Sequence, residues 1–133
     1  MDDELLSRVK RDGSDGEPLA KHFANIGCFK DGRLLGFFSI AYATKTTIDV
    51  HINFTKNNRG YAGVFSKMML KNLFSDPTIN RVESEIPIIY DSMVKFVEKI
   101  GFLVEGRKRG AFLKNKQWHD SYIVGITRKD YVN

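Results

Sequence analysis

Residues 48–73 join a strand pattern directly to a helix pattern, and this junction constrains the fold more than any other part of the sequence. From Ile48 to Phe54, apolar residues alternate with polar ones, which is the two-residue period of a half-buried strand. Apolar residues then recur at helical spacing, at Phe65, Met68, Met69 and Leu73. The segment 56–64, Lys-Asn-Asn-Arg-Gly-Tyr-Ala-Gly-Val, therefore leads from a strand into the N-terminus of a helix.

This junction is predicted to bind an anion. The first backbone N–H groups of a helix have no partner inside the helix, and they lie at the positive end of the helix dipole. The small residues Gly60, Ala62 and Gly63 let the chain turn sharply there. Phosphate groups bind at such helix ends. On this segment alone, an ordinary glycine turn before a helix is the alternative.

The composition indicates one domain with a substantial core. The chain has 133 residues, of which 42% are hydrophobic and 12% aromatic. We expect a single domain over 1–133, with a short helix and loop at 1–20 and the core at 21–133. The formal charge of +5 is uneven, because residues 1–20 hold six acids and three bases while the rest holds ten acids and eighteen bases. A basic body favours nucleic acid, membrane surfaces or cofactors with several phosphates, unless its charges are simply solvated.

Cysteine usage and the first residues indicate a reducing cytoplasm. Cys28 is the only cysteine, so the sequence provides no disulfide framework and no cysteine cluster for a metal. Its neighbours Ile26 and Phe29 favour a buried core thiol over a nucleophile. The start of the chain lacks the features of a signal peptide, and no apolar run is long enough to span a bilayer.

The predicted elements alternate between strands and helices in a way that favours an α+β (mixed α/β) fold. The chain is expected to begin with a short helix at 2–11 and a loop at 12–18, followed by strands at 22–30 and 33–43 and a third strand that ends at residue 54. The helix after the junction comes next, then a strand at 81–88, a helix at 91–100 and two strands at 103–114 and 118–127. Asp31-Gly32 and residues 115–117 are the expected hairpin turns. Asp91 is the expected N-cap of the second long helix, and Gly101 is its expected stop. The fourth and fifth strands of this order should be parallel, because a full helix connects them.

Several segments together resemble the GCN5-related N-acetyltransferase (GNAT) superfamily. Residues 57–62 fit its cofactor motif, Gln/Arg-x-x-Gly-x-Gly/Ala, except that Asn57 replaces the Gln or Arg. The later residues resemble the RimJ/RimL branch, which acetylates ribosomal-protein N-termini: Asp91-Ser92, 96–102 (Phe-Val-Glu-Lys-Ile-Gly-Phe), Glu105-Gly106-Arg107, Arg109, His119-Asp120 and 126–128. Residues 51–54, His-Ile-Asn-Phe, also resemble the short acetyltransferase-like proteins of tailed phages. The resemblance covers about 45–130.

This resemblance implies a mixed, mostly antiparallel, V-splayed sheet flanked by helices, with a shortened N-terminal region. Its opened fourth and fifth strands would admit acetyl-CoA as co-substrate, with the pyrophosphate on the amides of about 58–63 and neutralised by Arg59 and Lys56. Ile52 and Phe54 should face the core and point away from any site. The residues expected to contact the cofactor are Phe54, Lys56, Asn58, Arg59, Gly60, Tyr61, Ala62, Gly63, Asp91 and Phe96.

The implied reaction is direct attack of a primary amine on the thioester. It needs a base for the ammonium proton and a donor for the leaving thiolate. Asp49 and His51 share one strand face and are the candidate bases; otherwise they are solvated strand residues. Tyr90 and Ser92 are the candidate donors; otherwise they are a rim aromatic and a helix-start hydroxyl.

Two further groups of residues are open to more than one interpretation. The run from Arg107 to Arg109 could bind nucleic acid, line a substrate or be solvated, because strand residues point alternately to opposite faces. Trp118, His119 and Tyr122 either line an acceptor channel or pack at a strand edge.

Some positions depart from the family pattern. Asp91 replaces an Asn that contacts the pantetheine arm, and Val97 replaces the Tyr that protonates the thiolate in many members. Only about twenty residues precede the second family strand, so the acceptor site should be minimal, open, or completed by a homodimer or another partner chain.

Two functions follow from these residues. The first is an acetyl-CoA-dependent N-acetyltransferase that acts on a protein N-terminus, a lysine or a small amine, in the cytoplasm of a bacterial or phage-infected cell. The alternative is a catalytically degenerate structural or interaction protein of the same fold, such as a phage virion or morphogenesis component. A membrane partner is not expected, and a nucleic-acid partner is the weakest of the hypotheses.

Overall fold

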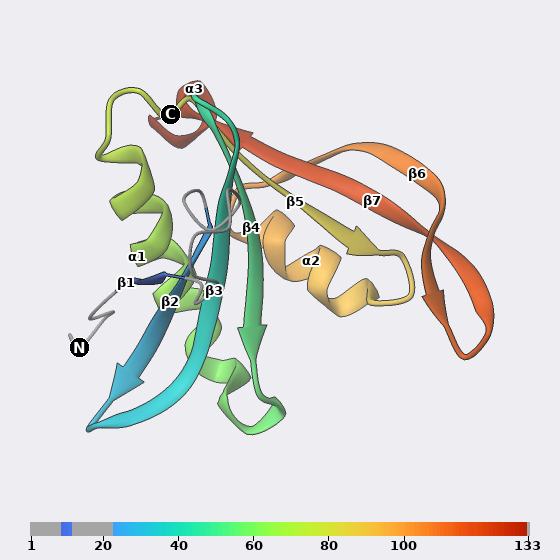
Figure 1. Ribbon diagram of the computed structural model, residues 1–133, viewed down its shortest axis with the longest axis horizontal. Helices are drawn as coiled ribbons and strands as arrows, with labels where there is room; N and C mark the ends of the chain where they lie inside the picture. Colours follow the sequence, from blue (N-terminus) through green and yellow to red (C-terminus); the bar gives the residue numbers. More distant parts are fainter. Residues whose placement is uncertain (1–8, 12–22, 133) are drawn as a thin grey trace.

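The computed structural model describes residues 9–11 and 23–132, which form a mixed sheet with helices packed on it. The sheet has seven strands in the order β1-β2-β3-β4-β5-β7-β6 (Figure 1). The elements are β1 (Val9–Arg11), β2 (Phe23–Lys30), β3 (Arg33–Thr44), β4 (Thr47–Phe54), the 3-10 helix η2 (Lys56–Tyr61), α1 (Ala62–Phe74), β5 (Arg81–Pro87), α2 (Asp91–Lys99), β6 (Leu103–Lys114), β7 (Gln117–Thr127) and α3 (Arg128–Val132). The α+β architecture expected from the sequence is confirmed.

Both expected hairpin turns are present. Asp31 and Gly32 join β2 to β3 with φ angles of 53° and 78°, the left-handed conformation that a two-residue turn between antiparallel strands requires. Asn115 and Lys116 join β6 to β7 in the same conformation, with φ angles of 52° and 63°. This second turn is shorter than predicted, because Gln117 already belongs to β7.

The sheet opens between β4 and β5. These neighbours are parallel and pair over only three residues of each strand, from Thr47 opposite Arg81 to Asp49 opposite Glu83. Beyond that point the two strands separate. The parallel orientation expected for 81–88 and 103–114 is also observed, since β5 and β6 each run antiparallel to β7, but β7 lies between them. The parallel neighbours of the sheet are therefore β4 and β5, joined through α1.

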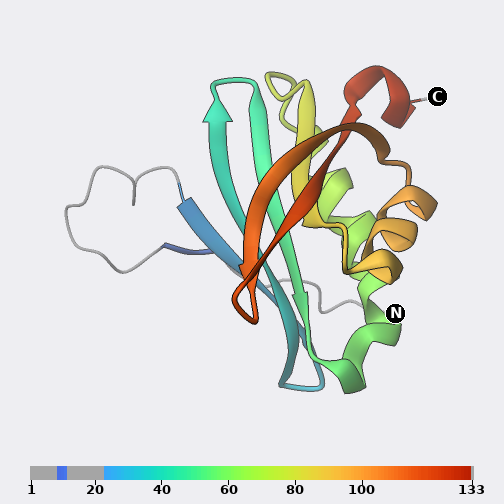
Figure 2. The ribbon, with the colours of Figure 1, turned by 90° about the vertical axis from the view of Figure 1, so that its right-hand side faces the viewer.

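The two long helices cover the same face of the sheet (Figure 2). Their buried side chains share one apolar cluster with the inward-facing strand residues, and its largest fully buried members are Phe38, Phe102, Leu35 and Leu70. Cys28 belongs to this cluster, as expected, and burial raises the pKa of its thiol to about 12. Within the described residues no helix covers the other face of the sheet, so the polar side chains of β4 and β5 on that face stay accessible.

Helix α2 ends as the sequence indicates but begins differently. Gly101, at φ 116°, lets the Phe102 N–H bond the Val97 carbonyl and its own N–H bond the Glu98 carbonyl, which closes the helix. The expected N-cap is wrong: Tyr90 caps the helix without a side-chain bond, and Asp91 is the first helical residue. There the Asp91 carboxylate forms an ion pair at 3.2 Å with Lys95, one turn later.

The predicted helix at 2–11 is wrong over the part that the structure describes. Residues 9–11 form strand β1, which pairs antiparallel with β2, with Val9 opposite Ile26. A free sheet edge beside β2 offers backbone hydrogen bonds that a short helix cannot match. The rest of that prediction and the loop at 12–18 lie outside the described residues. Over the described chain, no helix is long and apolar enough to cross a membrane.

Candidate active site

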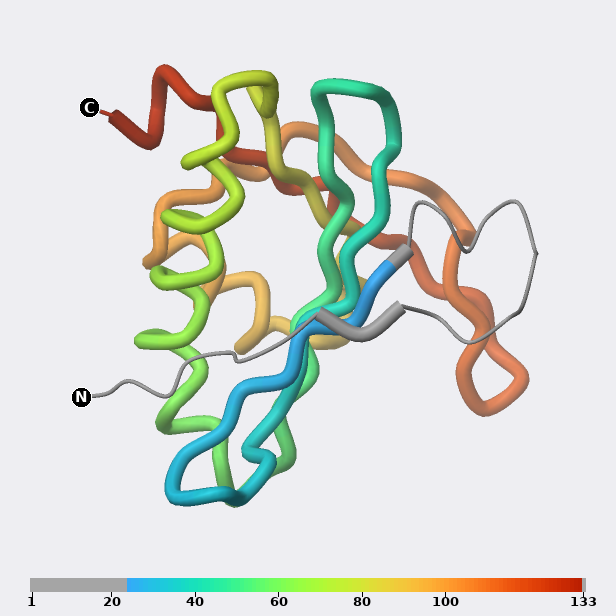
Figure 3. The backbone as a smooth tube through the Cα atoms, turned by 60° about the vertical axis from the view of Figure 1, so that its left-hand side comes forward, coloured from blue at the N-terminus to red at the C-terminus, as the bar shows by residue number. Residues whose placement is uncertain are grey.

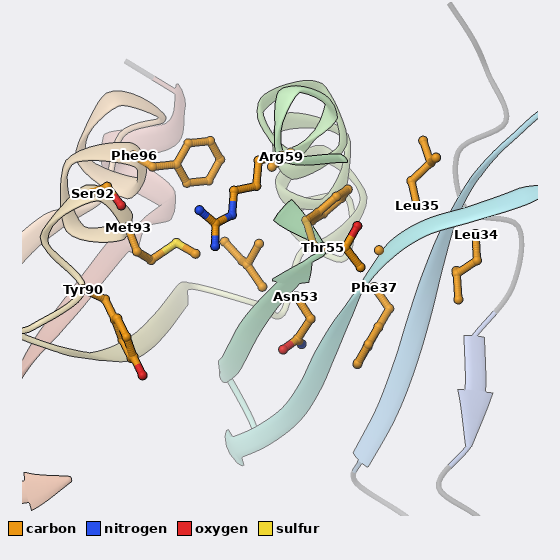
Figure 4. A pocket seen from close by; sticks show the side chains of 14 residues that line it. Leu34, Leu35, Phe37, Asn53, Thr55, Arg59, Tyr90, Ser92, Met93 and Phe96 are labelled. Carbon is orange, nitrogen blue, oxygen red and sulfur yellow. The ribbon is translucent and has the colours of Figure 1, made fainter. Parts of the chain in front are cut away.

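A cleft of about 880 Å³ opens where β4 and β5 separate. It extends from the start of α2, across the end of β4, to the beginning of β3, and Figure 4 shows its lining from these three elements. Its walls are mainly apolar: Leu34, Leu35, Gly36, Phe37, Ile52, Phe54, Ala62, Met93 and Phe96. The polar lining residues are Asn53, Thr55, Arg59, Tyr90 and Ser92. The cleft can therefore hold a long, partly apolar ligand that carries a few polar groups.

The β3 side of the cleft depends on a close approach of two strands. Gly36 lies opposite Phe54, and a Cβ atom at Gly36 would come within 2.6 Å of the Phe54 ring and the Asn53 carbonyl oxygen. Phe54 also contacts Phe38 edge-on, with ring centroids 5.9 Å apart, and lies 6.1 Å from the Phe65 ring. Ile52 and Phe54 pack against the core, as predicted, but the expectation that they face away from any site is wrong, because both line the cleft. For Phe54 this position agrees with its expected contact to the cofactor.

Arg59 supplies the cleft with a positive charge. Its guanidinium lies between Phe96 and Met93 on α2 and Thr55 at the end of β4 (Figure 4). Within the described residues no carboxylate forms an ion pair with Arg59 or Lys56. An anionic group would therefore find, in an apolar cleft near the start of α1, a cation that no described carboxylate neutralises.

Two of the amides at 58–63, which are expected to bind the pyrophosphate, already have backbone partners. Residues 56–61 form a 3-10 helix, in which the Asn58 N–H donates to the Thr55 carbonyl at 2.9 Å. The Ala62 N–H likewise donates to the Arg59 carbonyl. Tightening the first turn in this way satisfies amides that an α-helix would leave open. The anion-binding capacity of the segment therefore depends more on Arg59 than the sequence suggested.

The remaining residues expected at the cofactor lie around the cleft rather than in it. Asn58 donates through Nδ2 to the Thr55 hydroxyl at 2.8 Å. Tyr61 packs against the core, and a Cβ atom at Gly63 would lie 3.9 Å from the Phe96 ring. Lys56 and Gly60 are exposed on η2, and Asp91 is exposed on α2. Of the ten residues expected at the cofactor, those that line the cleft are Phe54, Arg59, Ala62 and Phe96.

The structure brings the two candidate bases together. His51 Nε2 lies 3.4 Å from Asp49 Oδ2, on the sheet face that no described helix covers. The hydrogen bond to Asp49 raises the pKa of His51, burial opposes this, and the charges of Asp49 and Glu85 add to the rise. Neither side chain lines the cleft, but Asn53, two residues further along the same face of β4, does. The pair therefore lies next to the cleft on its open side.

Other carboxylates on this face are held in ion pairs. Arg81 binds Glu83 through Nε at 2.8 Å and Glu105 through its two terminal nitrogens at 2.6 and 3.0 Å, and these bonds raise its pKa. Its guanidinium lies over Gly125, where a Cβ atom would come within 2.6 Å of it. Lys108 Nζ lies 3.0 Å from Glu85. Among the described residues, no three Asp, Glu, His or Cys side chains form a metal site.

Tyr90 and Ser92, the candidate thiolate donors, both line the cleft from the start of α2. Val97, which corresponds in sequence to the family Tyr, is 1% exposed and packs in the core instead. A donor at the cleft must therefore come from a different position. Tyr90 is also contacted from the β6–β7 hairpin, because Lys114 Nζ lies 3.2 Å from its hydroxyl.

The sequence interpretation missed the β3 wall of the cleft and Met93. Leu34 to Phe37 were assigned only to a strand, because their role depends on the register that sets Gly36 opposite Phe54. One signal was available: a glycine inside an apolar strand often marks a close approach of another backbone or a ligand.

Comparison with known proteins identifies the family. The family model of the acetyltransferase (GNAT) domain matches residues 24–123. No curated protein sequence matches the chain. Among solved structures, spermidine N-acetyltransferase from Vibrio cholerae in complex with CoA and spermine has a TM-score of 0.77 at 16% identity, covering 84% of this chain and 69% of that one. A chimera of that enzyme, SpeG, with hSSAT has a TM-score of 0.78 at 16% identity, covering 84% and 70%. With its splayed sheet and its match over most of the sequence, the chain belongs to the GNAT acetyltransferase family.

Proposed function

We propose that the chain is an N-acetyltransferase that transfers an acetyl group from acetyl-CoA to a primary amine. One observation carries the proposal: the cleft formed by the separation of β4 and β5 combines long apolar walls with the guanidinium of Arg59, which forms no ion pair with any described carboxylate. A pantetheine arm matches such walls, and a pyrophosphate matches the cation. Use of acetyl-CoA is a property of GNAT domains, and one structural neighbour binds CoA.

The residues present fit this cofactor. Arg59, in the last turn of η2, and the exposed Lys56, at its first residue, would neutralise the pyrophosphate. Phe54, Ala62 and Phe96 would contact the pantetheine arm from both sides of the cleft. When bound, the cofactor supplies an acetyl group activated as a thioester. The amides of 58–63 have a smaller role than the sequence suggested, because the 3-10 helix already uses two of them.

The Asp49–His51 pair is the proposed base. An amine is protonated near neutral pH and must lose a proton before it can act as a nucleophile. His51 accepts that proton in its neutral form, and Asp49 orients the ring and stabilises the resulting imidazolium. Tyr90 or Ser92, at the rim of the cleft, donates a proton to the departing sulfur. The acceptor approaches from the open sheet face, where no described helix blocks it.

The proposal is tested by measuring CoA release from acetyl-CoA with a panel of amines: spermidine, free lysine and peptides with a free N-terminus. Asp49→Asn and His51→Gln should lower kcat by about 10² to 10⁴, the usual contribution of a general base. Lys71→Gln on the far end of α1 is the control and should not change the rate. Bound acetyl-CoA without turnover of any amine would contradict the proposal.

A non-catalytic protein of the same fold is the second candidate. Two observations favour it: Val97 is buried where many relatives carry the thiolate donor, and the Asp91 carboxylate is held by Lys95 outside the cleft. If this candidate is correct, CoA binds, but the wild type releases no CoA from acetyl-CoA with any amine, and Asp49→Asn and His51→Gln behave in the same way.

A further inference from the structure

The end of the β6–β7 hairpin, residues 107–118, forms a surface that the proposed reaction does not use. We call it the basic arm, because it contains five bases, at Arg107, Lys108, Arg109, Lys114 and Lys116, and no acid. It projects away from the helices in Figures 1 and 3. Trp118 and Leu113 on the arm are 65% and 53% exposed. Large exposed apolar side chains among unpaired charges mark interaction sites.

Part of the arm's charge is neutralised within the chain. Arg107 Nε lies 2.8 Å from Asp120, and Lys108 is paired with Glu85. Arg109 also acts on Asp120, whose pKa is lowered by the Gly110 amide, by Arg107 and by the charge of Arg109. Lys114 and Lys116 form no ion pair with any described residue. The outer half of the arm therefore keeps a positive charge.

Lys114, one of the two lysines of the arm that form no ion pair with a described residue, lies at the mouth of the cleft. Lys114 Nζ lies 3.2 Å from the Tyr90 hydroxyl and 5.0 Å from the centre of its ring. Phe112 packs edge-on against the same ring, with centroids 5.8 Å apart. Since Tyr90 lines the cleft, a ligand whose amine enters the cleft would meet the arm with its remaining atoms.

The carboxylates beside the cleft already have side-chain partners within the described residues. Asp49 contacts His51, Arg81 binds both Glu83 and Glu105, and Lys108 binds Glu85. A polycationic acceptor would have to displace these partners, and it would be repelled by Lys114 and Lys116 on the arm. An acceptor with negative charges near its amine would be attracted.

We propose that the basic arm binds an acidic polypeptide whose N-terminal or lysine amine enters the cleft; this inference rests on the proposed acetyltransferase function. A polypeptide is favoured over a nucleic acid because the reaction requires a primary alkyl amine, which nucleic acids lack. β6 pairs only with β7 among the described strands, so its other edge is open to an extended peptide. The exposed side chains of Trp118 and Leu113 would provide apolar contacts to the peptide in addition to the charge attraction.

The test uses the single tryptophan of the chain, Trp118, as a reporter of binding. The full chain is titrated with a short glutamate-rich peptide that has a free N-terminus, and tryptophan fluorescence is recorded. The controls are a lysine-rich peptide of equal length, spermidine and a single-stranded oligonucleotide. We expect saturable binding of the acidic peptide alone, weakening as salt is added.

Charge-reversal variants test whether the acidic peptide binds at the basic arm. The double variant Lys114→Glu with Lys116→Glu should bind the acidic peptide about tenfold more weakly or worse, because two surface charges change sign. Lys71→Glu with Lys129→Glu, two exposed lysines on α1 and α3, matches the change in net charge and should have no effect. Equal weakening by both double variants, no binding of the acidic peptide, or tighter binding of spermidine or the oligonucleotide would overturn the inference. Failure of the proposed function would instead appear as the absence of CoA binding, or of acetyl transfer to any amine, while the acidic peptide still binds.

Discussion

Gly36→Ala should destabilise the chain and damage the cleft together. The new Cβ atom would lie 2.6 Å from the Phe54 ring and from the Asn53 carbonyl oxygen, a separation that real Cβ atoms do not tolerate. Phe54 cannot swing away freely, because it packs between Phe38 and Phe65. Overpacking of this kind costs about 2 kcal/mol. For a domain of this size, that cost lowers Tm by about 8 °C.

The assay is thermal unfolding, followed by calorimetric titration with CoA at a temperature where both proteins are folded. Gly106→Ala is the matched control, because Gly106 lies in β6 with open space around its Cβ position, so the same chemical change causes no clash. We expect the control to retain its Tm and CoA affinity, and Gly36→Ala to lose about tenfold in affinity as Phe54 shifts into the cleft. Equal Tm values for the two variants would refute the packing argument.

Three further outcomes are expected from the charges and the core. The raised pKa of His51 keeps its ring protonated to a higher pH, so the ascending limb of the pH–rate profile should lie above about pH 6.5. In Asp49→Asn this limb should shift to lower pH, because the hydrogen bond that raises the pKa is lost. If Asp49 were itself the base, that variant would be inactive at every pH. Arg81→Leu should lower the free energy of unfolding in urea by about 2 kcal/mol, since Glu83 and Glu105 both lose their partner; Lys99→Leu, an exposed control, should not. Cys28 should react with a thiol reagent only in denaturant, because burial raises its pKa to about 12; rapid reaction in the native chain would contradict this.

The sequence predicted the order of elements well because local signals agree with the fold. Alternation in β5 places Val82, Ser84 and Ile86 inside, as the pattern indicates. Gly101 ends α2, and Asp31-Gly32 turns the first hairpin, because only certain backbone conformations fit there. The errors at the N-terminus arose where pairing with β2 outweighed a weak helical pattern.

The site was harder to predict because it depends on long-range register and on the path of one short segment. The opening of the cleft lies where β4 and β5 stop pairing after Asp49 and Glu83, and no local pattern encodes that point. The 3-10 conformation of residues 56–61 redirected amides that sequence reasoning left free. Whether Asp49 and His51 act as a base remains a prediction, as do the roles of Tyr90 and Ser92.

Calorimetric titration of acetyl-CoA tests whether the cleft binds the cofactor with its pyrophosphate at Arg59. Wild type should bind, and Gly60→Glu should bind about tenfold more weakly or worse, because a carboxylate beside Arg59 repels the pyrophosphate. Gly60 has no atom near its Cβ position, so this variant should keep the Tm of the wild type. Gly106→Glu, equally uncrowded but on β6, should bind as the wild type does. Absence of binding to the wild type at about 1 mM ligand would contradict cofactor binding in the cleft, and equal affinity of all three proteins would contradict the position of the pyrophosphate.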